Sequence, residues 1–375
     1  MNVPKLRFKE FNDEWIETKI QNVATIIGGG TPSTDEPKYW GNEINWFTPS
    51  EIGKTKYVTI SNRKISQDGL KNSSAKLLPK GTILLSSRAT VGEASILLNE
   101  ASTNQGFQSL IVNENNCNEF IYYLKYKYKR EMLIKSFGST FLEISKSNVE
   151  NIKIKIPSKE EQFMIANFLS LLDKKIELQS KKIEDLKLFT KKLETQYIFN
   201  SNDEYNKKRI DEIFNVKTGG DLNKSNISFI KTPLFCYPIY SNNLEMNGLY
   251  GYSDIYKIEE ESITVTGRGD IGKAIKREGK YYPIVRLLVL IPKISVNLIY
   301  MQEAVNNLKL IQESTGVPQL TAPQISKYKV SYPTLDIQNK YGDILLLLQE
   351  KIRYEIRKIE KLHQQKKGLM QNMFV

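Results

Sequence analysis

Two stretches of the chain repeat one pattern of apolar residues, at alternating steps of four and three. Between positions 159 and 199 the pattern consists of Leu172, Ile176, Ile183, Leu186, Leu193 and Tyr197. Near the end of the chain it consists of Leu348, Ile352, Ile359, Leu362, Leu369 and Met373, each 176 positions after its counterpart. A spacing of 3.5 residues is the seam of a coiled coil. The pattern therefore predicts two long helices of one design that pack on each other.

Polar residues interrupt both seams at the same two steps. The first stretch carries Gln179 and Thr190 where apolar residues are expected, and the second carries Glu355 and Lys366. A polar residue in such a seam fixes the register of the helices at a cost in stability. Proline precedes each helix, which makes Ser158 and Thr334 the predicted N-caps.

The segments before the helices are also duplicated. Ile20 and Gly30 have counterparts 190 positions later, and Arg88 and Gly92 have counterparts 180 positions later. Trp15 to Ile27 is predicted to enter a strand. Further short strands are predicted in each half, at 82–85, 109–112, 263–265 and 287–291, and helices at 119–135 and 296–312.

Such a long period indicates a gene duplication rather than a solenoid. We therefore expect a globular domain at 1–157, a long helix at 158–200, a second globular domain at 201–333 and a second long helix at 334–375. A short polar link at 200–204 joins the halves. Between the shared landmarks the two halves differ, as at 54–71 and 223–247. Two domains that share one framework but recognise different targets would differ in this way.

The chain has a formal net charge of +12, spread over both halves. A distributed positive charge favours a polyanionic partner, nucleic acid first, and solubility alone is the alternative explanation. A single histidine and two distant cysteines argue against histidine-based triads, zinc knuckles and disulfide frameworks. No apolar leader and no run of about 18 apolar residues occurs, so we expect a cytoplasmic protein.

One motif resembles a phosphate-binding loop. Residues 267–274 read GRGDIGKA, which matches GxGxxG, but the continuation IKREGK does not begin a helix. The first half lacks two of these glycines, so a shared β-turn that carries an arginine is the better account. No catalytic constellation emerges from the sequence. Two alternatives to a protein that only binds nucleic acid remain. One is a stand-alone DNA methyltransferase or nuclease with an unrecognised site, and the other is a structural coiled-coil scaffold.

The order and recurrence of these motifs resemble the DNA-specificity subunit of type I restriction-modification systems. The resemblance rests on Gly-Gly-Gly-Thr-Pro-Ser at 28–33, the Arg-x-x-x-Gly turns at 88–92 and 268–272, Thr-Asn-Gln at 103–105 and Ile-Pro-Ser-x-x-Glu-Gln at 156–162. It implies an α+β fold with two similar target-recognition domains of mixed α/β structure, separated by two long helices that form an antiparallel coiled coil. It also implies a non-catalytic subunit, each of whose domains reads one half of a split DNA target. The second half departs from the pattern, because it lacks Pro and Ser after Gly219-Gly220 and has no Thr-Asn-Gln.

The resemblance further implies partners: double-stranded DNA, two methyltransferase subunits docked on the helices, and restriction subunits joined through them. S-adenosylmethionine, ATP and magnesium would then be bound by the partner subunits rather than by this chain. Arginines at strand ends are candidates for phosphate contacts, and Asn and Gln for base edges or phosphates, with hydrogen bonding of turns as the alternative for each. The candidate DNA-binding residues are Thr31, Ser33, Lys54, Lys56, Arg63, Lys64, Arg88, Asn104, Gln105, Asn223, Lys224, Asn242, Asn243, Arg268, Lys273 and Arg286.

Overall fold

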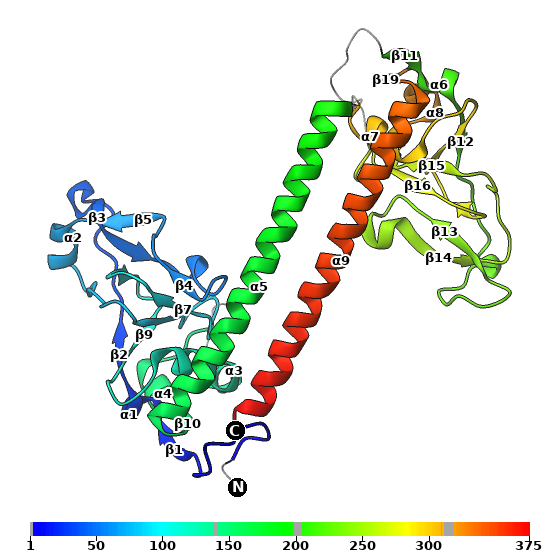
Figure 1. Ribbon diagram of the computed structural model, residues 1–375. Helices are drawn as coiled ribbons and strands as arrows, with labels where there is room; N and C mark the ends of the chain where they lie inside the picture. Colours follow the sequence, from blue (N-terminus) through cyan, green and yellow to red (C-terminus); the bar gives the residue numbers. More distant parts are fainter. Residues whose placement is uncertain (1–2, 138–141, 199–204, 309, 311–317) are drawn as a thin grey trace. The chain divides into compact units, whose positions relative to one another are not determined.

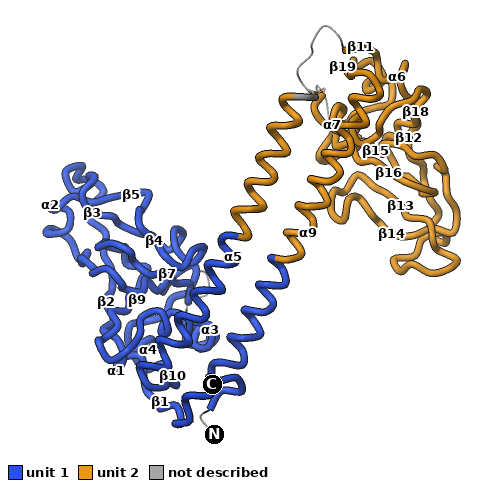
Figure 2. Tube along the Cα trace, viewed as in Figure 1, with its two compact units in different colours: residues 1–178, 359–375 blue, residues 179–358 orange. Residues whose placement is uncertain are grey.

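The computed structural model describes residues 3–137, 142–198, 205–308, 310 and 318–375 (Figure 1). The chain forms two compact units, residues 1–178 with 359–375 and residues 179–358 (Figure 2). Helices α5 (Lys159–Leu193) and α9 (Leu335–Met373) contribute to both units. Unit 1 contains the start of α5 and the end of α9, so the two helices run antiparallel. The predicted link at 200–204 lies outside the described residues.

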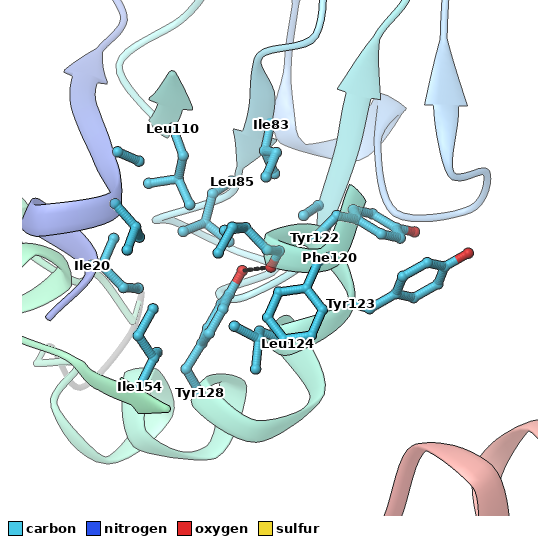
Figure 3. Close-up of a cluster of buried hydrophobic side chains, with 14 of the residues drawn as sticks. Ile20, Ile83, Leu85, Leu110, Phe120, Tyr122, Tyr123, Leu124, Tyr128 and Ile154 are labelled. Carbon is cyan, nitrogen blue, oxygen red and sulfur yellow. Dashed lines mark hydrogen bonds between the residues drawn. The ribbon is translucent and has the colours of Figure 1, made fainter. Parts of the chain in front are cut away.

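Unit 1 is built around a five-stranded sheet. Its strand order is β2 (Ala24–Gly28), β9 (Gln108–Val112), β6 (Ile83–Leu85), β7 (Ala94–Leu97) and β4 (Tyr57–Val58). Helix α3 (Asn118–Ile134) covers one face and buries Phe120, Tyr123 and Tyr128 there (Figure 3). Leu169 of α5 and Met370 of α9 belong to the same core. The long helices are therefore anchored in the domain by shared apolar packing.

A second, smaller sheet in unit 1 has the order β5 (Arg63–Ile65), β3 (Trp40–Phe47) and β8 (Ser102–Thr103). A separate pair joins β1 (Ile16–Lys19) to β10 (Lys153–Ile156). The short helices of this unit are α1 (Ile20–Val23), η1 (Pro37–Tyr39), η2 (Pro49–Glu51), α2 (Gln67–Lys71) and α4 (Lys146–Glu150).

Unit 2 repeats this topology, except that its main sheet has four strands where that of unit 1 has five. Its main sheet has the order β12 (Phe214–Thr218), β18 (Leu288–Pro292), β15 (Ser262–Val265) and β16 (Ala274–Arg277). Its small sheet has the order β14 (Leu249–Ser253), β13 (Tyr237–Tyr240) and β17 (Tyr282–Pro283), and β11 (Asn206–Arg209) pairs with β19 (Lys329–Tyr332). Its short helices are α6 (Ile210–Ile213), η4 (Lys224–Asn226), η5 (Glu245–Gly248), α7 (Leu298–Asn306) and α8 (Ala322–Ser326). The predicted α+β duplication with an antiparallel helix pair is confirmed.

Each long helix begins at the same point of the repeat, 176 residues apart, and the same glutamine secures both beginnings. Gln162 Nε2 donates to the Pro157 carbonyl at 3.1 Å, and Gln338 Nε2 donates to the Pro333 carbonyl at 2.9 Å. The Gln162 side-chain oxygen accepts the backbone N–H of Cys117, and that of Gln338 accepts the N–H of Asn297. Both glutamines are buried, so they tie each long helix to the start of the helix that covers its sheet.

The seam residues are buried or half-buried wherever the structure describes their side chains; that of Tyr197 lies outside this set. Gln179 and Glu355 occupy the same position of the repeat and bond each other, with Gln179 Nε2 2.5 Å from Glu355 Oε2. Each residue is therefore bonded to its own counterpart in the repeat. Lys182 Nζ completes the site, 2.6 Å from Glu355 Oε1. These hydrogen bonds lower the pKa of Glu355 from 4.5 to about 2, against the effect of burial.

Three predicted elements differ from the structure. The helix expected at 296–312 ends at Asn306, where Asn306 and Asn307, both weak helix formers, are hydrogen-bonded to neighbouring backbone. Positions 311–312 lie outside the described residues. The entry strand at 15–27 is interrupted by the single turn of α1, and α5 ends at Leu193 before a π-helical turn at Glu194–Ile198. Among the described residues, no helix combines the length and apolar character needed to span a membrane.

Candidate nucleic-acid interface

A glycine turn lies against the end of the same strand in each domain. A Cβ on Gly29 would lie 2.0 Å from the Asn104 carbonyl oxygen, and one on Gly219 would lie 2.5 Å from the Ile284 carbonyl oxygen. The next residue of each turn, Gly30 or Gly220, donates its N–H to the backbone of β8 or β17 at 2.9 and 3.0 Å. No side chain fits at the first position, which explains why both halves carry a glycine there.

In unit 1, two tryptophans are tied to this turn. Trp46 Nε1 donates to the Gly30 carbonyl at 2.9 Å, and Trp40 Nε1 donates to the Ser33 carbonyl at 3.0 Å. Their rings meet edge to face with centroids 5.2 Å apart. The guanidinium of Arg63 lies over the Trp40 ring, 3.6 Å from its centroid. These contacts fix an exposed arginine beside the glycine turn.

Thr31 and Gln105 complete the same surface. The Thr31 hydroxyl donates to Gln105 Oε1 at 2.5 Å, which leaves the exposed amide NH₂ of Gln105 as a donor. We call the group Thr31, Ser33, Trp40, Arg63 and Gln105 the glycine-turn patch. It brings together four of the residues predicted to contact DNA, with Trp40 as a support that the prediction missed. The missed signal is the pair of tryptophans six positions apart, since the chain has only three.

The corresponding surface of unit 2 carries different side chains. Arg286 adopts a left-handed backbone conformation, φ 67°, and its Nη1 donates to Gln319 Oε1 at 3.0 Å. A pocket of about 300 Å³ lies between Arg286 and the Gly219–Gly220 turn. Asp221 and Val285 stand where the first domain has Thr31 and Gln105. The second domain therefore presents another set of polar groups from the same framework.

Several of the predicted DNA-binding residues have side chains that are hydrogen-bonded within the fold. Lys56 has a side chain only 9% exposed, and its ammonium lies 2.8 Å from Glu119 Oε2 and 2.5 Å from Ser170 Oγ. Asn104 Oδ1 accepts the N–H of Gly106, and Asn242 bridges the N–H of Gly267 and the Val285 carbonyl. The polar atoms of these three residues hold turns and the helix junction together, and their contact with DNA stays a prediction.

The Lys56 site couples the first domain to its long helix. Burial alone would raise the pKa of Glu119, but hydrogen bonds from Lys56, Tyr57 and Ser170 lower it. Glu119 thus stays ionised and paired with the buried ammonium.

The two equivalent arginines differ in their surroundings. Arg88 forms an ion pair with Glu143 at 2.8 Å and remains half-exposed. Arg268 is half-buried, and its Nε has no hydrogen-bond partner among the described residues. Both follow the first strand of a hairpin whose glycine, Gly92 or Gly272, has φ above 80°. Residues 267–273 thus form the turn between β15 and β16, as the sequence indicated, and not a phosphate loop.

The remaining candidates form no ion pair within the described part of the chain. Their side chains are exposed or half-exposed, and they come from the two variable stretches, 54–71 and 223–247, and from the second hairpin turn. The group consists of Lys54, Lys64, Asn223, Lys224, Asn243 and Lys273. The Asn243 side-chain oxygen accepts the N–H of Glu245, so Asn243 also braces its own turn.

Comparison with known proteins agrees with this twofold framework. A family model for the type I restriction modification DNA specificity domain matches residues 12–188 and 202–364. The chain belongs to this family. The duplicated halves described above are therefore two copies of the specificity domain, and the family's sequence pattern extends into both long helices.

Curated relatives carry matching names. The chain is 36% identical over 238 residues to the type I restriction enzyme MjaIX specificity subunit of Methanocaldococcus jannaschii, covering 58% of this chain and 55% of that protein. It is 28% identical over 175 residues to the EcoR124I/EcoR124II specificity subunit of Escherichia coli, covering 45% and 43%. The chain thus aligns with about half the length of these relatives.

Solved structures share the fold. A type I restriction-modification S subunit from M. genitalium superposes with a TM-score of 0.68 at 19% identity, covering 100% of this chain and 99% of that one. A chain from a study of complex assembly and conformational transition of the type I R-M system gives a TM-score of 0.59 at 14% identity, covering 95% and 96%.

Proposed function

We propose that this specificity-family chain is the DNA-reading subunit of a type I restriction-modification complex. Each globular domain would read one part of a split duplex target. The observation that carries the proposal is the framework shared by both domains, which places unlike side chains at the same point: Thr31 and Gln105 in one, Asp221 and Val285 in the other. A net charge of +12 supplies the sequence-independent attraction to phosphate.

In this proposal the chain is not an enzyme. It contributes recognition, and partner subunits contribute the adenine methyltransferase and restriction activities together with S-adenosylmethionine, ATP and magnesium. The antiparallel pair of α5 and α9 would set the gap between the two parts of the target. A protein that binds a duplex with two domains reads two sites at a fixed separation.

The proposal is tested by selection from a pool of duplexes with randomised sequence. The purified full chain, alone and with its methyltransferase partner, is expected to enrich a motif of two short blocks separated by a constant gap. Exchanging residues 205–330 for those of a relative should change one block and preserve the other. Enrichment of no motif, or methyl transfer by the chain alone, would contradict the proposal.

The long helices also suggest where the methyltransferase subunits bind. Leu171 and Leu178 on α5 are 69% and 59% exposed, and Leu347 and Tyr354, each 176 positions later on α9, are 66% and 58% exposed. Each helix thus carries a matching exposed apolar pair, seven residues apart on one face. On α9 the Lys351 ammonium lies over the Tyr354 ring, 5.6 Å from its centroid. Because the pair is duplicated with the repeat, it fits two copies of one partner, and we assign it to the two methyltransferase subunits.

Replacing one apolar pair by aspartate should halve the number of bound methyltransferase subunits. We expect Leu171→Asp with Leu178→Asp to leave one subunit per chain, and Leu347→Asp with Tyr354→Asp to do the same, as measured by native mass spectrometry. The matched control is Leu188→Asp, since Leu188 is also exposed on α5 but has Gln364 at its repeat position. Two subunits bound to either double variant would rule out this surface.

A further inference from the structure

We propose that Arg63 is a specificity-determining residue that reads a guanine of the half-target bound by the first domain. Its guanidinium would donate two hydrogen bonds to O6 and N7 in the major groove. This inference rests on the proposed function and adds the base class and the residue that recognises it.

The backbone places Arg63 opposite one tryptophan, and its side chain stacks on another. In the antiparallel pairing of β3 and β5, Arg63 faces Trp46, and a bulge in β3 brings Trp40 into the same pairing. The guanidinium carbon lies 3.6 Å from the centroid of Trp40 and 5.5 Å from that of Trp46. Since both indoles are hydrogen-bonded to the glycine turn, the surface under the guanidinium is rigid. Stacking orients the plane of the fork before any partner arrives.

The donors of Arg63 are unused. Its side chain is exposed and makes no hydrogen bond or ion pair with any residue that the structure describes. A second arginine that stacks on an aromatic ring, Arg277, is the opposite case. Arg277 lies 3.7 Å from the Tyr240 ring centroid but is only 5% exposed, and it donates to Thr264 Oγ1 and the Asn247 carbonyl at 2.9 and 2.7 Å. The guanidinium of Arg277 is therefore buried and hydrogen-bonded within the fold, whereas the exposed guanidinium of Arg63 keeps its N–H donors available for a partner.

The comparison of the two domains favours a base contact over a phosphate contact. Trp46 pairs with Ser102 as Ile239 pairs with Tyr282, which makes Ile239 the structural counterpart of Trp46. The residue opposite Ile239 is Gly251, so the second domain has a glycine where the first has Arg63. Phosphate contacts serve any sequence and suit positions that both readers share. A side chain present in one reader only can carry the difference between their targets.

The test compares full-chain variants in duplex selection and in salt-dependent binding. We expect Arg63→Ala and Arg63→Lys to lose the preference for one G·C pair within the first block of the motif and to keep every other position. The lysine variant retains the charge but not the fork, so it separates charge from geometry. On the cognate duplex the affinity should fall roughly 5- to 150-fold, with little change on a duplex substituted at that pair. Lys54→Ala, at an exposed lysine that pairs with no acidic residue among those described, is the control for a uniform loss.

The outcomes are distinct. A loss of affinity that is equal on all duplexes, with the salt slope reduced by about one, would assign Arg63 to a phosphate and overturn the inference. An unchanged motif in both variants would also overturn it. In either case a split motif enriched by the wild-type chain would leave the proposed function intact. A wild-type chain that enriches no motif would contradict both the inference about Arg63 and the proposed function. A far-ultraviolet circular dichroism melt of each variant verifies that the domain remains folded.

Discussion

Inserting one heptad into each long helix is expected to lengthen the gap in the recognised DNA sequence. Seven residues at about 1.5 Å each add about 10 Å of helix, which corresponds to roughly three base pairs if the domains are only translated. Seven residues fall about 20° short of two full turns, so the seam remains in line along the longer pair. The measurement is duplex selection with the variant and the wild-type chain side by side.

The structure dictates where the insertions belong. A second copy of residues 180–186 placed after Leu186 would lie opposite a second copy of 348–354 placed before Leu348. Gln179, Lys182 and Glu355 then keep their contacts at the centre of the pair. A deletion at the same place would remove Lys182 and its ion pair.

A single insertion is the matched control. A heptad added to α5 alone leaves seven residues without a partner in α9, so we expect a lower melting temperature and loss of target binding. The spacing role is refuted if the doubly inserted chain melts like the wild type and enriches a motif with an unchanged gap.

Sequence periodicity was sufficient to place the long helices. The starts of α5 and α9 follow directly from proline, the cap residue and a seam that repeats at 176 positions. The spacing of apolar residues in the sequence places them on one face of a helix, and that face is the one that packing buries. The duplication strengthened this prediction, since each copy tests the other.

The site was predicted less completely, because its contacts join residues that are distant in the chain. Lys56 looked like a surface lysine until the fold brought Glu119 and Ser170 to it, 63 and 114 positions away. The support of Arg63 by Trp40 depends on a bulge in β3, and no composition or spacing rule predicts that contact. Residue type suggested which groups could bind DNA, and tertiary structure showed which of them are already hydrogen-bonded within the fold.

Replacing Gln179 by glutamate is expected to reverse the acid dependence of the helix pair's stability. In the wild type, the bonds from Lys182 and Gln179 lower the pKa of Glu355 to about 2, from 4.5. A group whose pKa is lowered in the folded state stabilises the protein above its unfolded pKa. That contribution is lost as the pH falls from about 4.5 towards 2, because protons then bind the unfolded chain more tightly.

In the Gln179→Glu variant, two carboxylates would share the position now held by an amide and a carboxylate. Like charges in contact raise the pKa of one member of the pair, so this variant should be destabilised at neutral pH and recover as the pH falls through about 5. The measurement is the melting midpoint of the helical signal between pH 7 and pH 3, expressed as the difference from wild type. Glu355→Gln, which pairs two amides, should show neither trend.

The exchanged pair, Gln179→Glu with Glu355→Gln, provides the decisive control. Lys358 and Lys175 stand at the repeat positions of Lys182 and Lys351, so a glutamate moved to position 179 finds lysines at the same spacing. We expect the exchanged chain to recover the wild-type midpoint and its loss of stability in acid. The repulsion of like charges also favours the pairing of α5 with α9. Two copies of α9 would bring Glu355 against Glu355, whereas α5 with α9 joins an amide to a carboxylate. An exchanged chain that stays as unstable as Gln179→Glu at neutral pH would show that the two halves of the seam are not equivalent.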